Sequence, residues 1–213
     1  MKNINLFSSH LFVKNVGTEE QKQDLKNQIL SAKDNNVGYI PSGNKKCWRS
    51  SAKYEMDWLE KEVLILTRAA IDYYKDIDPD YKKVKDEKIT MATWTNVNDP
   101  KSKNVVHAHK EFSFVGLYYI DAEGTGDLIF HNPINLLSDC NPKSPFVRTV
   151  SYPPKNGNLL LWPAWVPHEV EINNSDRYRI NMAFDIFLGE MGGIYFSYMK
   201  TLCKMQSGIL INT

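Results

Sequence analysis

The hydrophobic pattern of the chain changes period near residue 88, and this change constrains the fold more than any other feature. Before it, apolar residues recur at helical spacing. After it, short runs rich in β-branched and aromatic residues are separated by Gly, Pro and Asn, which is typical of strands. The runs are ITMATWTNV, SFVGLYYI, GDLIFHNP, FVRTVSYPP, NGNLLLWP, HEVEIN and YRINMAFDIF. Seven such runs after two helices predict an all-β core, an antiparallel barrel or sandwich, with flanking helices on one outer face.

Two amphipathic helices are predicted before this core. Thr18 can cap a helix that continues through EEQKQDLKNQILSAKDNN, where Leu25 and Ile29 lie at helical spacing. A second helix is expected over Met56–Tyr74, and its apolar stripe consists of Leu59, Val63, Leu66 and Ala70. The segment between them, GYIPSGNKKCWRSSAKY, is either an ordinary polar connector or a cover over a binding cleft.

Length and composition favour a single domain. A chain of 213 residues that is 42% hydrophobic can bury one substantial core. We therefore expect one domain over 1–213, with a mainly helical flank at 1–87, the β core at 88–188 and a C-terminal packing segment at 189–213. Because this last segment is apolar, it is expected to pack as a helix on the sheet or to contact a partner subunit in a homodimer.

Charge and cysteine content exclude some classes of partner. The net charge is +1 and the basic residues are spread along the chain, so electrostatics give no reason to expect nucleic acid or an anionic membrane as a partner. No apolar run approaches the length of a membrane span. Three cysteines, far apart and without a C-x-x-C motif, indicate reduced thiols in a cytoplasmic protein.

Three histidines and one arginine stand out as candidate site residues. His107 and His109 are two residues apart in VVHAHKEFSFVGLYYI, His168 lies in LLLWPAWVPHEVEIN, and Arg179 follows in RYRINMAFDIF. In HEVEIN, His168 shares a strand face with Val170 and Ile172, while the two glutamates share the other face and belong in water. His168 is therefore predicted to face the interior of the barrel.

Alternation also separates Arg179 from its apolar neighbours. Arg179, Asn181 and Ala183 share one strand face, opposite Tyr178, Ile180, Met182 and Phe184. An inward arginine implies a polar pocket within the barrel and helices that cover the outer apolar face. That arrangement fits a ligand cavity in the mouth of a β-barrel.

The combined order of these motifs resembles the iron(II)/2-oxoglutarate oxygenase superfamily, and within it a group of oxygenases found in marine phages and bacteria. The resemblance covers 94–187 and rests on WTNVN, HAH, GLYYI, GDLIFHNP, GNLLLWPAWVPHEV and RYRINMAFD, with INLFSSHLFV similar to the start of that group. It implies a double-stranded β-helix, a jelly-roll or cupin-like barrel. It also implies a cytoplasmic enzyme, in the host cytoplasm if phage-encoded, whose substrate is a small molecule or a peptide.

The resemblance assigns roles residue by residue. His107 and His168 match metal ligands for Fe²⁺, and Arg179 matches the anchor of the C5 carboxylate of 2-oxoglutarate. Tyr119 matches a tyrosine that contacts that carboxylate in related prolyl hydroxylases, and Asn181, on the same strand face as Arg179, is placed in the same cosubstrate site.

Position 109 departs from the family pattern, which has a carboxylate there. With histidine, the site gains one unit of charge, so Fe²⁺ with dianionic 2-oxoglutarate is net neutral instead of net negative. We expect His109 to be the third ligand, since imidazole binds ferrous iron well. The alternatives are a water molecule, a carboxylate such as Asp127, or a histidine that contacts the ligands or the substrate.

Two classes of function follow from these motifs. The preferred one is an Fe(II)- and 2-oxoglutarate-dependent dioxygenase, a hydroxylase that couples decarboxylation of 2-oxoglutarate to C–H oxidation. The other is a non-catalytic or non-2-oxoglutarate metal-binding barrel of the cupin type. Arg179 discriminates between them, because a barrel that only binds metal has no need of an inward cation there.

Overall fold

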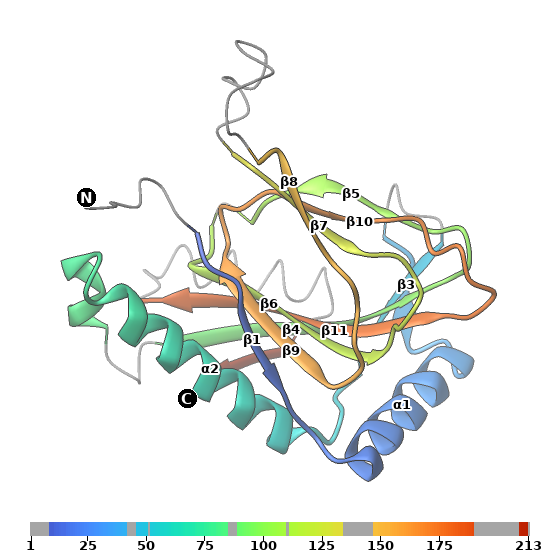
Figure 1. Cartoon of the computed structure of the whole chain (residues 1–213). Coiled ribbons are helices and arrows are strands. Elements are labelled where there is room, and N and C mark those ends of the chain that lie inside the picture. The colour runs from blue at the N-terminus through green and yellow to red at the C-terminus, as the bar shows by residue number, and fades with distance from the viewer. Residues whose placement is uncertain are drawn as a thin grey trace.

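Two antiparallel sheets face each other, and two helices lie along the outer face of the larger sheet (Figure 1). The structure is a computed structural model that describes residues 9–41, 46–50, 52–84, 89–109, 111–133, 147–189 and 209–212. The larger sheet has the order β1 (Phe12–Asn15), β9 (Asn158–Pro163), β6 (Phe114–Asp121), β11 (Arg179–Leu188), β4 (Ile89–Asn98), β3 (Cys47–Ser50) and β2 (Gly38–Tyr39), and β12 (Ile209–Asn212) also pairs with β4. The smaller sheet has the order β5 (Asn104–His107), β10 (His168–Val170), β7 (Leu128–His131) and β8 (Thr149–Tyr152).

Both predicted helices are present. Helix α1 (Glu19–Asp34) begins after Thr18, whose hydroxyl accepts a hydrogen bond from the backbone N–H of Gln21, while the side chain of Gln21 accepts one from the backbone N–H of Thr18. This reciprocal capping satisfies two N–H groups at the helix end. Helix α2 (Asp57–Tyr74) buries the predicted stripe, and a short 3₁₀ helix (Pro79–Lys83) follows it.

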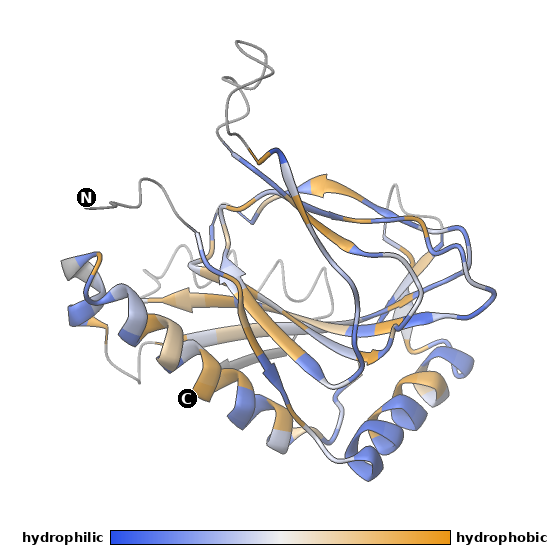
Figure 2. Ribbon diagram, in the orientation of Figure 1, coloured by the Kyte–Doolittle hydropathy of each residue, from blue (hydrophilic) through white to orange (hydrophobic). Residues whose placement is uncertain are grey.

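Alternation along β11 divides the molecule into two cores. Ile180, Met182 and Phe184 belong to the apolar layer between the larger sheet and the helices. Ala183 packs instead in the layer between the two sheets, together with Trp94. Strand β9 is orange over most of its length, whereas α1 is largely blue (Figure 2). Helices therefore cover the outer apolar face, as predicted, and leave the opposite face of β11 for the space between the sheets.

Some sequence expectations need correction. Each of the seven predicted runs forms a strand, but the expected helical flank also contains β1, β2 and β3, which extend the larger sheet. The connector GYIPSGNKKCWRSSAKY thus contributes two strands. Strand β10 ends at Val170, so Ile172 is exposed and not inward. At the C-terminal end, 209–212 pairs with β4 as a strand, and the helix expected for the tail falls on 190–208, outside the described residues.

Two further expectations concern thiols and membranes. Cys47 is a free thiol in the buried part of β3, whereas Cys140 and Cys203 lie outside the described residues. Burial raises the pKa of the Cys47 thiol to about 11, which makes it a poor nucleophile. Among the helices that the structure describes, none combines the length and apolar character needed to cross a membrane.

Candidate functional site

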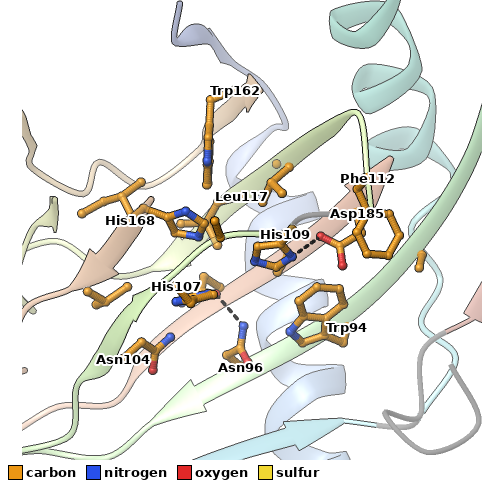
Figure 3. Close-up of a pocket in the computed structure, with 18 of the residues that line it drawn as sticks. Trp94, Asn96, Asn104, His107, His109, Phe112, Leu117, Trp162, His168 and Asp185 are labelled. Carbon is orange, nitrogen blue, oxygen red and sulfur yellow. Dashed lines mark hydrogen bonds and ion pairs between the residues drawn. The ribbon is translucent and has the colours of Figure 1, made fainter. Parts of the chain in front are cut away.

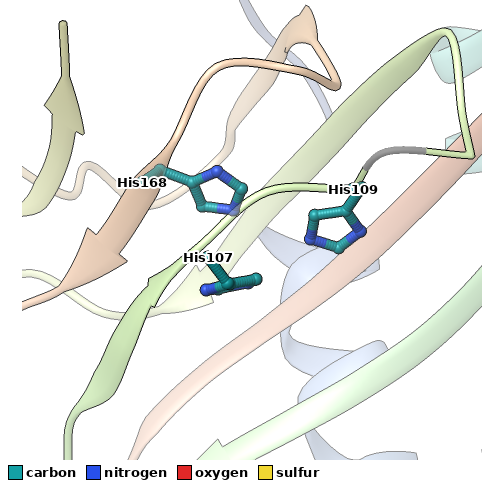
Figure 4. Close-up of side chains that lie close together, drawn as sticks. All are labelled: His107, His109 and His168. Atoms are coloured by element: carbon teal, nitrogen blue, oxygen red, sulfur yellow. The ribbon is translucent and has the colours of Figure 1, made fainter. Parts of the chain in front are cut away.

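The three predicted histidines meet at one end of the smaller sheet (Figure 4). His107 ends β5 and His168 begins β10, and the antiparallel register of these strands places the two residues opposite each other. His109 follows β5 and is held by a hydrogen bond of 2.9 Å from its backbone N–H to the carbonyl of Ala164. One nitrogen from each of the three rings lies within 4.8 Å of the other two.

Each ring is oriented by an acceptor behind its Nδ1 atom. Nδ1 of His107 lies 2.8 Å from the carbonyl of Val105, and Nδ1 of His168 lies 3.0 Å from the carbonyl of Val166. A carbonyl oxygen can only accept, so these Nδ1 atoms donate and each Nε2 keeps a free lone pair. Metal-binding histidines characteristically have such an acceptor behind the ring.

His168 is the most buried of the three rings, at 4% exposure. Burial, reinforced by the nearby His107, lowers its imidazole pKa to about 3. The ring is therefore neutral at physiological pH, which is the form that can ligate a metal ion. Trp162 packs edge-on against the ring with 5.0 Å between the centroids, and this contact fixes the ring from the side.

The third ring has a carboxylate behind it. Nδ1 of His109 lies 2.8 Å from Oδ1 of Asp185, which is buried on β11 (Figure 3). Asp185 shares the strand face of Arg179 and Asn181, since all are separated by even numbers of residues. Sequence reasoning missed this residue, although that alternation could have found it. The alternative carboxylate, Asp127, is not in the histidine cluster and accepts a hydrogen bond from Ser151.

Arg179 is a buried cation whose hydrogen bonds are incomplete. It is 1% exposed, and its Nη1 atom donates to the carbonyl of Gly126 at 2.6 Å. Its Nε and Nη2 atoms are buried without a hydrogen-bond partner, and so is the hydroxyl of Tyr119, whose ring centre lies 5.4 Å from the guanidinium carbon. Burial raises the pKa of Tyr119 to about 12, so this hydroxyl is protonated. Arg179 and Tyr119 interact electrostatically with each other, but none of these three buried polar atoms has a well-formed hydrogen bond within the described residues.

Gly126 is required where it approaches Arg179. Its φ angle is +96°, and a Cβ atom there would lie 2.9 Å from the carbonyl oxygen of Ile172. Side chains other than glycine rarely adopt this conformation, and here they would also meet backbone atoms. The glycine of the GDLIF motif therefore allows its carbonyl to reach the arginine.

A cavity of about 460 Å³ opens beside the histidines. Its polar wall includes Asn181 from β11 and Asn96 from β4, joined by a hydrogen bond of 3.1 Å between their side chains. Trp94 and Phe112 form apolar parts of the wall (Figure 3). Arg179 and Tyr119 are not among the lining residues. Arg179 lies two residues from Asn181 on β11, about 7 Å along a strand.

Two other residues of the cavity wall were not singled out from the sequence. Arg49, from β3, lines it with its guanidinium carbon 5.5 Å from the centre of the Trp94 ring. Glu111 lines it from the exposed side. His131 is not part of the histidine cluster, and its Nε2 lies 3.1 Å from Oε1 of Glu169.

Comparison with protein families agrees with the resemblance seen in the sequence. Residues 92–185 match the model of a family described as "Putative 2OG-Fe(II) oxygenase". The matched segment contains the three histidines, Tyr119, Asn181, Arg179 and Asp185. No curated protein matches the chain at a significant level.

Solved structures confirm the fold. A prolyl-4-hydroxylase from Pseudomonas putida has a TM-score of 0.59 at 9% identity, with 84% of this chain and 93% of that chain covered. HygX from Streptomyces hygroscopicus, solved with nickel, 2-oxoglutarate and hygromycin B bound, has a TM-score of 0.56 at 10% identity, with 84% and 83% covered. A Trichoplax adhaerens prolyl hydroxylase, solved with a hypoxia-inducible-factor peptide, has a TM-score of 0.55 at 14% identity, with 83% of each chain covered. At such identities the likeness establishes the jelly-roll fold, as predicted.

Proposed function

We propose that this enzyme of the 2OG-Fe(II) oxygenase class is an iron- and 2-oxoglutarate-dependent hydroxylase of a small molecule or a peptide side chain. In the proposal, His107, His109 and His168 hold Fe²⁺, while Arg179 and Tyr119 bind the C5 carboxylate of 2-oxoglutarate. Asn181 lies between these two groups, at the polar wall of the cavity. The observation that carries the proposal is the buried arginine with two unpartnered donors.

The histidine cluster fits a ferrous ion. Three imidazoles, each offering one ring nitrogen, can occupy one face of an octahedral ion and leave the other face open. The histidine at position 109 removes the usual carboxylate from the ligand set, but Asp185 places one directly behind the ring. With Asp185 counted, Fe²⁺ and dianionic 2-oxoglutarate give the site a net charge of −1, equal to that of the usual site. The carboxylate in this protein thus lies behind a ligand ring, whereas in the usual site it is itself a ligand.

The unpartnered atoms near Arg179 fit a carboxylate. An uncompensated buried cation is expensive, and a planar guanidinium can donate two parallel hydrogen bonds to a carboxylate. The protonated hydroxyl of Tyr119 adds a third donor beside it. A barrel that bound only metal would bear the cost of burying Arg179 without any gain, so these residues favour the oxygenase over the cupin-type alternative.

The protein's contribution to the reaction is to position the bound groups and to keep water away from them. When bound, iron and 2-oxoglutarate supply the oxidation: O2 is split between succinate, formed with CO2 from 2-oxoglutarate, and the hydroxyl group of the product. Trp162 and Leu117 form apolar walls beside the histidines (Figure 3), which restrict water near the reacting atoms. The Asn96 and Asn181 amides, which also line the cavity, offer polar contacts to a ligand.

Product analysis tests this function. Aerobic incubation of the iron-loaded protein with 2-oxoglutarate is expected to form succinate and CO2 in equal amounts, slowly without substrate and faster with it. His168→Ala is expected to lose this turnover, because it removes one of three ligands. Iron-loaded protein that never forms succinate above the level of the His168→Ala control would contradict the proposal.

A further inference from the structure

Arg49 brings a second cation to the site, from a part of the chain outside the family match. It lies on β3, which pairs with β4 so that Arg49 is opposite Asn96. Both residues line the cavity. The segment that contains β3 was expected to be either a connector or a cover over a cleft, and the structure places one of its charged side chains in the cavity wall.

The positive charge of Arg49 is not neutralised within the described part of the chain. No carboxylate there forms an ion pair with it, and its Nε atom is buried without a hydrogen-bond partner. Two acids line the same cavity, but Asp185 contacts His109 and Glu111 is on the exposed side. Its guanidinium carbon lies 5.5 Å from the centre of the Trp94 ring, and the guanidinium also interacts with the neutral thiol of Cys47 and lies near His107, neither of which neutralises its charge. Stacking on a ring leaves the edge of the guanidinium, which carries the N–H donors, available to a ligand.

Arg49 and Arg179 are suited to different ligands. Arg179 lies on β11 outside the cavity lining, with its guanidinium carbon 5.4 Å from the centre of the Tyr119 ring, whereas Arg49 lines the cavity itself from a different strand. One dianionic cosubstrate uses one carboxylate at the metal and one at Arg179. Arg49 therefore remains for an anionic group that belongs to another molecule in the cavity.

We infer that the substrate carries a carboxylate, and that Arg49, stacked on Trp94, binds this carboxylate and so determines which substrates are accepted. This inference rests on the proposed function. Among the described residues that line the cavity, Arg49 is the only Lys or Arg, so its single charge matches a monoanion better than a phosphate dianion. A cavity of about 460 Å³ matches a small molecule.

The test uses the full chain loaded with Fe²⁺ and saturating 2-oxoglutarate under anaerobic conditions. Isobutyrate, benzoate and a set of N-acetyl-L-amino acids are compared with their primary amides by calorimetry, and phenyl phosphate is compared with benzoate. We expect carboxylates to bind more tightly than the matching amides by on the order of tenfold or more. In Arg49→Gln this preference is expected to disappear, and in Arg49→Lys to be partly retained, since the charge remains but the fork is lost.

Several outcomes would overturn the inference. These are equal binding of acids and amides by the wild type, no binding of any carboxylate of the set, tighter binding of phenyl phosphate than of benzoate, or an unchanged preference in Arg49→Gln. A loss of 2-oxoglutarate binding in Arg49→Gln would instead make Arg49 a cosubstrate anchor. The absorption band of the iron–2-oxoglutarate chelate is recorded first for the wild type, so its absence counts against the proposed function and not against the role of Arg49.

Discussion

Asp185 places a carboxylate against His109, the position at which the family pattern itself has a carboxylate. The two residues are far apart in the sequence, and a search for His-x-Asp next to His107 cannot find it. Strand alternation gives the necessary signal, because Asp185 is six residues after Arg179 and so shares its inward face. The prediction of His109 as a ligand was argued from its residue type and its position in the family pattern, whereas the contact between His109 and Asp185 supplies a geometric reason for it.

Removal of the Asp185 charge should weaken metal binding without unfolding the protein. In Asp185→Asn the side chain keeps its shape but loses the negative charge that lies 2.8 Å from Nδ1 of His109, so affinity for Fe²⁺ is expected to fall by about 10- to 100-fold. A competition titration with a chelator of known affinity measures this. Asp127→Asn is the matched control and should bind iron as the wild type does. Equal affinities in both variants would show that Asp185 does not position His109.

The buried His168 predicts how the stability of the metal-free protein depends on pH. Its pKa is about 3 in the folded protein and about 6.5 when unfolded, so between pH 6.5 and pH 3 only the unfolded chain takes up this proton. The free energy of unfolding should therefore decrease as pH falls from 6.5 towards 3, by about 1.4 kcal/mol per pH unit from this residue. Denaturant unfolding at several pH values, with a chelator present, measures the slope. His168→Gln cannot titrate and should have a shallower slope, and an identical slope would refute the assignment.

At the scale of elements, strong periodicity was predictable and short strands were not. Helix α2 and strand β11 each have a long run with one clear period, and both were predicted to within one residue of their observed starts. Strand β3 has four residues and no alternation of its own. It is a strand because β4 offers a free edge, which is a tertiary cause that no local pattern contains. Its contribution of Arg49 to the cavity could not be foreseen for the same reason.

The buried and exposed faces of α2 should contribute differently to the free energy of unfolding, and this difference can be measured. Leu59 is fully buried beneath the larger sheet, whereas Ile65 is on the exposed side of the same helix. Leu59→Ala is expected to lower the free energy of unfolding by about 2–5 kcal/mol, because it leaves a cavity in the apolar layer. Ile65→Ala should change it by no more than about 0.5 kcal/mol. Chemical denaturation compares the two, and similar losses would mean that α2 does not pack on the sheet through this face.

At the scale of the whole molecule, the two layers explain how one strand serves both stability and chemistry. The outer side of β11 packs on the helices, and its inner side carries the buried Arg179 together with Asn181 and Asp185, of which the last two line the cavity. Alternation predicted this inward arginine and the covering helices. The meeting of His107 with His168 depends on the register of β5 and β10, which the resemblance implied but local sequence does not determine. The identity of the substrate depends on the cavity shape, which only the assembled layers produce.

The central claim is that the histidine cluster and Arg179 together bind iron and 2-oxoglutarate, and one titration tests it most directly. 2-Oxoglutarate is added to the anaerobic iron-loaded protein while the metal-to-ligand charge-transfer absorption of the chelate is followed. We expect a saturable band in the wild type, binding weakened by on the order of 2–5 kcal/mol in Arg179→Ala with iron retained, and an intermediate loss in Arg179→Lys. Wild-type protein that holds iron but shows no band at millimolar 2-oxoglutarate, or an Arg179→Ala variant that binds 2-oxoglutarate as tightly as the wild type, would contradict the claim.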